Sequence, residues 1–140
     1  MKALAILPDW LMLIMQGDKT IECRTWKTNY RGELLLCSSA KRIPGTIPGH
    51  ALLICRLADV VPFTRKHLDA AALDKMPEGA AYAWMLEDIR YIKPFPVVGK
   101  LGLYEVDATP EILPPNTPED TADKFFEDFI LPLIYKPAQR

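Results

Sequence analysis

The chain has 140 residues, a hydrophobic share of 49% and a formal net charge of −1. This length fits a single domain over residues 1–140, and the apolar content is enough for a core, which excludes an intrinsically disordered chain. The near-neutral charge excludes a protein that wraps a nucleic-acid duplex through a global basic field.

The N-terminal segment predicts a strand followed by a helix. Residues 3–7 form a short apolar run that is typical of a strand. Pro8 and Asp9 then suit a helix start, and the helix should run to Gln16 and stop at Gly17. Because this helix is apolar nearly all round, we expect it to plug a barrel or cover a sheet.

The middle of the chain reads as short strands separated by turn signals. A turn falls at residues 29–32, and prolines and glycines punctuate a loop over residues 41–50. Thr64 is predicted to cap a helix that runs to about Met76. Few helices among several strands suggest a small barrel. The strands are predicted over residues 19–24, 33–38, 51–60, 81–86, 89–92 and 101–106.

The C-terminal part differs from the rest. We expect the domain core to occupy residues 1–107, and an extension with a helix over about 117–131 to follow. Thr117 suits a cap, Pro118 the first helical position, and Pro132 should limit or bend the helix. One apolar stripe is predicted on that helix, formed by Ala122, Phe125, Phe126, Phe129, Ile130 and Leu133.

Three cysteines, Cys23, Cys37 and Cys55, lie in apolar strand-like runs without a C-x-x-C motif. This usage predicts buried free thiols in a reducing compartment. We also see no signal peptide, and no apolar stretch approaches the ~18 residues needed to cross a bilayer. We therefore expect a cytoplasmic protein with no membrane partner.

Charged and aromatic residues concentrate between residues 10 and 32. Cations gather early and acids late in the chain, which favours a small anionic ligand held in one cleft. Arginine can grip a phosphate or a base edge, and aromatic rings can stack on a base. The early cations are Lys19, Arg24, Lys27, Arg31, Lys41 and Arg42.

Lys19, Glu22 and Arg24 are the leading candidates for a site. Arg24 would hold a phosphate or base edge, and Glu22 would accept a proton from a base amine. Lys19 would be an electrostatic anchor, or a base if burial lowered its pKa. The alternative is a solvated strand face with a Glu–Arg pair. Strict alternation places Lys19 opposite the other two, so it must lie in a turn before the strand or serve another site.

Aromatic residues form a second group of candidates. Trp26, Tyr82 and Trp84 are expected to stack on a base, with core or rim packing as the alternative. Trp10 is interpreted as a core residue, and Tyr30 as packing for a turn.

A third group is a polar segment that follows a predicted strand. Ser38, Ser39 and Lys41 could bind phosphate through hydroxyl and ammonium groups, or form an ordinary polar loop. Glu87 ends the aromatic strand and is either a site residue or a surface acid. Gly99-Lys100-Leu101-Gly102 lacks the Walker spacing, so we interpret it as a turn.

Several chemistries are not indicated. His50 and His67 are the only histidines, and neither has metal-ligand spacing with a cysteine or carboxylate. The chain has neither G-x-S-x-G nor G-x-G-x-x-G. We expect no metal and no other cofactor.

The motifs resemble one known family. Residues 17–26 read G-D-K-T-I-E-C-R-T-W, and N-Y-R-G follows at residues 29–32. This pattern resembles the ASCH family, a branch of the PUA-like fold, and the resemblance continues over roughly the first three quarters of the chain. Pro8-Asp9-Trp10 departs from the Gln-Pro-Trp that members often carry. The resemblance implies an α+β fold: a small PUA-like mixed β-barrel flanked by short helices, here with an extra C-terminal amphipathic helix.

The resemblance implies a binding module for single-stranded RNA or a modified nucleoside or nucleotide. An alternative is a metal-independent hydrolase, because some members act on N4-acetylcytidine and others are ribonucleases. That amidohydrolase branch uses a lysine, a threonine three residues later and a glutamate. Lys19 matches the lysine, but Glu22 stands at the threonine's place; catalysis would then fall to Lys19 and Glu22. The glutamate has no clean match among Asp74, Glu78 and Glu87.

A third reading is a coactivator-like protein-interaction domain. The acidic C-terminal helix would then dock a partner, although its apolar stripe also suits packing against the barrel.

Overall fold

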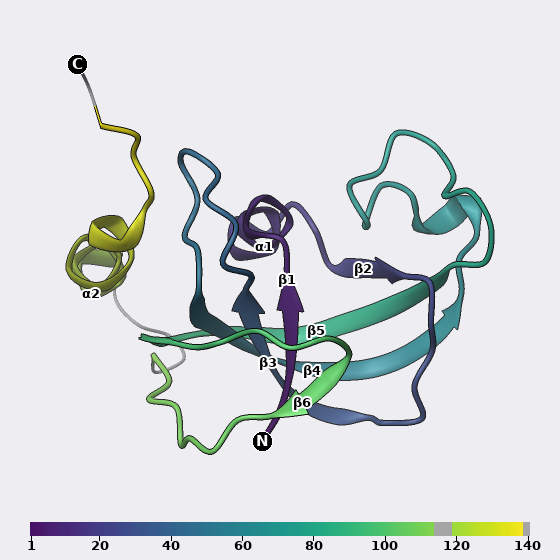
Figure 1. Ribbon diagram of the computed structural model, residues 1–140, viewed down its shortest axis with the longest axis horizontal. Coiled ribbons are helices and arrows are strands. Elements are labelled where there is room, and N and C mark those ends of the chain that lie inside the picture. The colour runs from purple at the N-terminus through teal and green to yellow at the C-terminus, as the bar shows by residue number, and fades with distance from the viewer. Residues whose placement is uncertain (114–118, 139–140) are drawn as a thin grey trace.

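The computed structural model describes residues 1–113 and 119–138 of the chain, and it forms a curved half-barrel sheet with helices packed against it (Figure 1). Six strands follow the order β2-β5-β4-β3-β1-β6 across the sheet. β1 and β3 are parallel, and the other neighbouring strands are antiparallel, so the sheet is mixed. The strands are β1 (Lys2–Ile6), β2 (Ile21–Arg24), β3 (Gly32–Ser38), β4 (His50–Pro62), β5 (Tyr82–Pro96) and β6 (Leu103–Glu105). The predicted α+β class and mixed barrel-like architecture are confirmed.

The central strands are apolar because both faces of the sheet are covered. Along β3, Leu34 and Leu36 pack into one core cluster, while Leu35 and Cys37 pack into a second cluster on the opposite face. This alternation follows from the period of two along a strand. The first cluster also takes the buried residues Leu11 and Ile14 of the helix α1. The long apolar run predicted over residues 51–60 is therefore a central strand, as expected.

The helix α1 (Pro8–Met15) begins at the predicted proline and ends as predicted before Gly17. Gly17 has a φ of +83°, which glycine adopts without the steric cost that a side chain imposes. The chain then turns back, and the backbone N–H groups of Asp18 and Lys19 both donate to Leu13 O. This turn brings the charged residues that follow α1 to the edge strand β2.

The helix predicted from Thr64 to Met76 is wrong. The chain forms only a short 3₁₀ turn, η1 (Arg65–His67), and then irregular turns. The carbonyls that would continue a helix are used elsewhere: Ala70 O accepts from Thr20 and Ile21, and Ala71 O accepts from the Lys19 ammonium. Tertiary hydrogen bonds thus replace the intrahelical ones and fix this segment beside β2.

The two strands predicted over residues 81–86 and 89–92 are one strand, β5. Asp88 carries a φ of +51° at the point where they join. Register shifts against β4 occur along the same stretch, and such bulges bend a strand without ending it. The acidic pair at residues 87–88, which suggested a strand end, marks this bend.

The C-terminal extension forms α2 (Glu119–Phe125), a π-helical turn η2 (Phe126–Ile130) and a 3₁₀ turn η3 (Leu131–Leu133). The predicted cap at Thr117 and Pro118 lies outside the described residues. Phe125, Ile130 and Leu133 pack against the first core cluster, whereas Phe126 and Phe129 stay partly exposed. Part of the predicted apolar stripe is therefore used to cover the half-barrel. In the part of the chain that the structure describes, no helix has the length and apolar character to cross a membrane.

Candidate functional site

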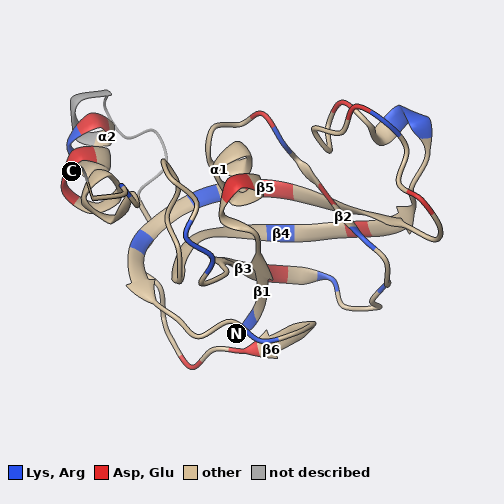
Figure 2. Ribbon diagram, turned by 45° about the horizontal axis from the view of Figure 1, so that its top comes forward, with Lys and Arg blue, Asp and Glu red and all other residues tan. Residues whose placement is uncertain are grey.

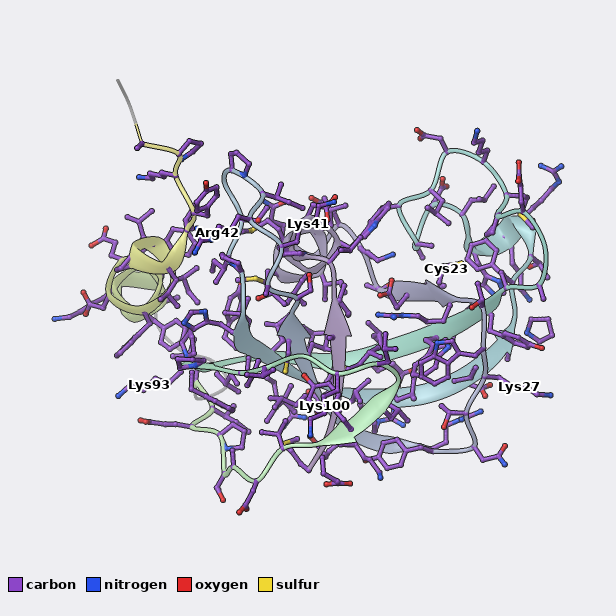
Figure 3. The ribbon with its side chains drawn as sticks, viewed as in Figure 1. Cys23, Lys27, Lys41, Arg42, Lys93 and Lys100 are labelled. Atoms are coloured by element: carbon purple, nitrogen blue, oxygen red, sulfur yellow. The ribbon has the colours of Figure 1, made fainter. Side chains whose placement is uncertain are left out.

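A cleft of about 530 Å³ opens where the end of β1, the start of α1 and the strand β2 meet two loops. We call it the charged cleft because Glu22 and Arg24 form part of its wall. One loop follows β3, and the other leads into β6 (Figure 3). The lining residues are Ala5, Leu7, Trp10, Glu22, Cys23, Arg24, Ser39, Ala40, Gly99, Lys100, Leu101 and Gly102.

Glu22 is the centre of a charged network beside this cleft. Its Oε2 accepts a hydrogen bond of 3.1 Å from Arg24 Nη2, and its Oε1 lies 3.5 Å from Lys19 Nζ. Arg24 Nη2 also donates to Ala5 O at 2.7 Å, which ties β2 to β1 across the cleft. Glu22 is only 6% exposed, so two cations compensate one buried carboxylate. The Glu–Arg pair thus lies in a cleft and not on an open, solvated face.

Two buried polar atoms in the charged cleft have no hydrogen-bond partner among the described residues: Arg24 Nε and Ser39 Oγ. A buried polar group that stays unpaired costs free energy, of the order of 1–3 kcal/mol. One atom is a donor, and the other is both donor and acceptor. Both residues line the cleft, so these atoms are the nearest unpaired polar groups for a polar ligand bound there.

Lys19 lies in the turn before β2, which resolves the conflict with strict alternation along that strand. It is 1% exposed, and its Nζ donates to Ala71 O at 2.8 Å. The same ammonium lies 4.7 Å from the centroid of the Trp10 ring. Burial lowers the pKa of Lys19, and the nearby Glu22 partly offsets this effect. Lys19 is therefore a buried anchor beside the charged cleft rather than a residue that lines it.

Trp10 and Cys23 border the charged cleft from two directions. Trp10 is half-buried, so it joins the core and still presents part of its ring to the cleft. Burial raises the pKa of the Cys23 thiol, and Glu22 next to it acts in the same direction. Cys23 is thus a neutral thiol near pH 7 and not an activated nucleophile.

A family model described as the ASCH domain matches residues 4–98, which include α1, β2 and most of the cleft wall. The chain belongs to the ASCH domain family. Solved structures agree with this assignment: the crystal structure of ASCH from Zymomonas mobilis has a TM-score of 0.61 at 12% identity, covering 91% of this chain and 94% of that one.

Crystal structures of two single-substitution variants of the Zymomonas mobilis ASCH protein are also similar to this chain. One has a TM-score of 0.56 at 14% identity, covering 91% of this chain and 96% of the other. The second has a TM-score of 0.57 at 13% identity, covering 90% and 94%. At this identity the likeness shows a shared fold. None of the curated proteins matches this chain.

The structure places several predicted site residues of this ASCH domain away from the charged cleft. Trp84 is completely buried, and its Nε1 donates to Trp26 O at 3.2 Å, so its ring offers no face to a base. Trp26 packs edge-on against it with ring centroids 4.7 Å apart. Tyr82 lies under the Lys27 side chain, whose Nζ is 5.9 Å from the ring centroid. These three aromatic rings serve core and rim packing, which was the alternative interpretation.

Three polar candidates are also displaced from the cleft lining. Ser38 is buried and exchanges hydrogen bonds with the backbone of His50, which closes the loop between β3 and β4. Glu87 is exposed on β5 and forms an ion pair with Arg56. Lys41 is exposed and follows Ala40, a cleft residue, so it lies beside the rim. Of the predicted cluster, Glu22, Arg24 and Ser39 are brought together.

The early cations do not form one surface patch. Lys19 is buried, and Arg31 pairs with Asp59 at 3.2 Å. Lys and Arg residues occupy several separate parts of the ribbon (Figure 2), and Lys27 lies far across the view from Lys41 (Figure 3). The cations are close in sequence but not in space, because β2, β3 and their loops diverge.

The loop over residues 99–102 is the part of the site that the sequence interpretation missed. Lys100 and Leu101 both line the charged cleft, and Leu101 is fully exposed. Gly99 approaches Ala5, since a Cβ at Gly99 would lie 3.3 Å from the Ala5 Cβ. The G-K-L-G sequence indicated a turn with a lysine, but only the pairing of β6 with β1 shows that this turn borders the charged cleft.

Proposed function

We propose that the charged cleft binds one nucleotide of single-stranded RNA, or a modified nucleotide. The observation that carries this proposal is the pair of buried polar atoms, Arg24 Nε and Ser39 Oγ, that the described residues leave unpaired beside Trp10. Arg24 would donate to a base edge or a phosphate, and the Trp10 ring would pack against the base. Glu22 would accept from an exocyclic amine through its remaining lone pairs.

A titration against a panel of nucleosides, nucleoside 5′-monophosphates and short single-stranded RNA tests this proposal. Isothermal calorimetry would show saturable binding by at least one phosphate-bearing member, with uncharged controls weaker. No saturable binding by any member would contradict the proposal.

Lys100 is expected to contact a phosphate from the rim of the cleft. Lys100→Ala should weaken binding of a short single-stranded RNA roughly threefold to fivefold, because one exposed ionic contact is worth up to about 1 kcal/mol. A plot of log affinity against log salt concentration should also become shallower, with its slope reduced by about 1, because one phosphate contact is lost. Lys93→Ala is the matched control, since Lys93 packs over Phe129 and lies well away from Lys100 (Figure 3). Equal effects of the two variants would contradict the role of Lys100.

A metal-independent hydrolase is the second candidate function, and the Lys19–Glu22 pair favours it. Burial lowers the pKa of Lys19, which increases the share of neutral amine that can act as a base. Glu22 Oε1 is 3.5 Å away and can exchange a proton with that amine. If the protein is a hydrolase, incubation without metal should release cytidine from N4-acetylcytidine or shorten labelled RNA, and Lys19→Gln should abolish the product. Absence of product from both substrates with folded protein would reject this candidate.

A further inference from the structure

A second cleft lies directly beside the charged cleft. It has a volume of about 540 Å³, against about 530 Å³ for the charged cleft. Trp10 and Cys23 line both clefts, so the two hollows are neighbours that share these side chains. We call the second hollow the neighbouring cleft. Its far wall is the segment of residues 72–78, and the opposite side is formed by Trp10 near the start of α1, Lys19 and Cys23 of β2.

The neighbouring cleft has a different chemistry from the charged cleft. Its walls are largely apolar and include Leu73, Met76 and Pro77 beside the Trp10 ring. Asp74, Lys75 and Glu78 add exposed charged groups at the rim, and the buried Lys19 also lines this cleft. Apolar walls suit a flat base, and the carboxylates of Asp74 and Glu78 can accept hydrogen bonds from the amines of such a base.

The far wall is held in place by the protein's own hydrogen bonds. Ala70 O accepts from two backbone N–H groups at the start of β2, and Ala71 O accepts from the Lys19 ammonium. Ala72 then adopts a φ of +57°, a conformation that residues other than glycine seldom take, and the chain turns at this point. These contacts therefore fix the start of the wall beside β2, so the position of the hollow is set by the protein's own hydrogen bonds.

Adjacent bases of an unstacked single strand can enter separate pockets and pack against aromatic rings. We propose that the two clefts together hold two successive nucleotides of one strand. The charged cleft takes one nucleotide with its phosphate near Lys100 and Arg24, and the neighbouring cleft takes the base of the next. The carboxylates at the rim give the second position a preference for an amine-bearing base, cytosine or adenine, over uracil. This inference rests on the proposed binding of a nucleotide in the charged cleft.

Calorimetry with a mononucleotide and with dinucleotides that extend it tests the inference. The wild-type protein should bind a dinucleotide about tenfold more tightly than the mononucleotide, a gain of about 1.4 kcal/mol, because the second base would pack against the apolar wall of Leu73, Met76 and Pro77. Met76→Asp should reduce this gain to less than about threefold and leave the affinity for the mononucleotide unchanged. The double change Asp74→Asn and Glu78→Gln should narrow the preference for cytosine over uracil at the second position, and it alters only exposed side chains. Glu111→Gln is the matched control.

The outcomes separate the two proposals. If the mononucleotide binds but a second nucleotide adds less than twofold with either base, the two-nucleotide inference is overturned and the one-nucleotide proposal stands. The same holds if the double change, in a protein with wild-type unfolding behaviour, leaves both the dinucleotide gain and the base preference unchanged. If neither ligand binds, both proposals fail. The inference is supported if Met76→Asp or the double change reduces the extra affinity for the dinucleotide and leaves the affinity for the mononucleotide unchanged.

Discussion

Arg24→Gln should weaken nucleotide binding about tenfold to a hundredfold. A hydrogen bond from a charged donor to a ligand is worth roughly 1.5–3 kcal/mol, and Arg24 has a buried Nε directed at no protein acceptor in the described residues. Glutamine is shorter and neutral, so it removes both the positive charge and the planar fork. The measurement is the dissociation constant of a nucleoside 5′-monophosphate by calorimetry.

Arg24→Gln is expected to lower both the affinity for the nucleotide and the free energy of unfolding, so the two effects must be measured separately. Arg24 also holds Glu22 and the Ala5 carbonyl, so its loss will cost some stability in addition to affinity. Arg24→Lys keeps the charge but loses the fork, and it should recover stability more than affinity. Arg31→Gln serves as a matched control because Arg31 forms an exposed ion pair with Asp59 outside the cleft. If Arg31→Gln weakens binding as much as Arg24→Gln, Arg24 has no specific role.

The strands and the first helix were predictable because local patterns and tertiary packing agree. Both faces of β3 are buried, so an unbroken apolar run marked it as a strand. Pro8 and Gly17 marked the ends of α1 by conformations that few other residues favour. In contrast, residues 64–76 have a helical apolar spacing, yet the carbonyls of Ala70 and Ala71 accept from the start of β2 and from Lys19. Such long-range hydrogen bonds leave no trace in a single sequence.

The site was predictable in part for a similar reason. Glu22 and Arg24 alternate along one short strand, so their common side followed from the period of two. The tryptophans were harder, because residue type does not tell whether a ring lies in the core or at a cleft. Trp84 is buried, while Trp10, expected in the core, borders both clefts. Lys100 joins the site only because β6 pairs with β1 at the opposite end of the chain.

Raising the pH from 8 to 10 should lower the free energy of unfolding by about 3 kcal/mol through two buried thiols. Burial raises the pKa of Cys37 from 9.0 to about 11 and that of Cys55 to about 12. Above pH 9 the unfolded thiols therefore lose protons that the folded thiols retain. The folded state then binds more protons than the unfolded state, so stability falls as pH rises. Each thiol contributes between about 1 and 2 kcal/mol at pH 10, one unit above the pKa of the unfolded thiol.

Cys55→Ala separates this effect from other alkaline titrations. Near pH 7 the variant should be less stable than the wild type by about 1 kcal/mol, because a buried sulfur is lost from the core. At pH 10 the two proteins should have nearly equal stability, since the variant no longer has the thiol that opposes folding there. Urea unfolding under reducing conditions at both pH values measures the difference. If the two proteins lose the same stability between pH 7 and pH 10, the Cys55 thiol has the same pKa in the folded and unfolded states. That result would contradict the burial of this thiol in the core.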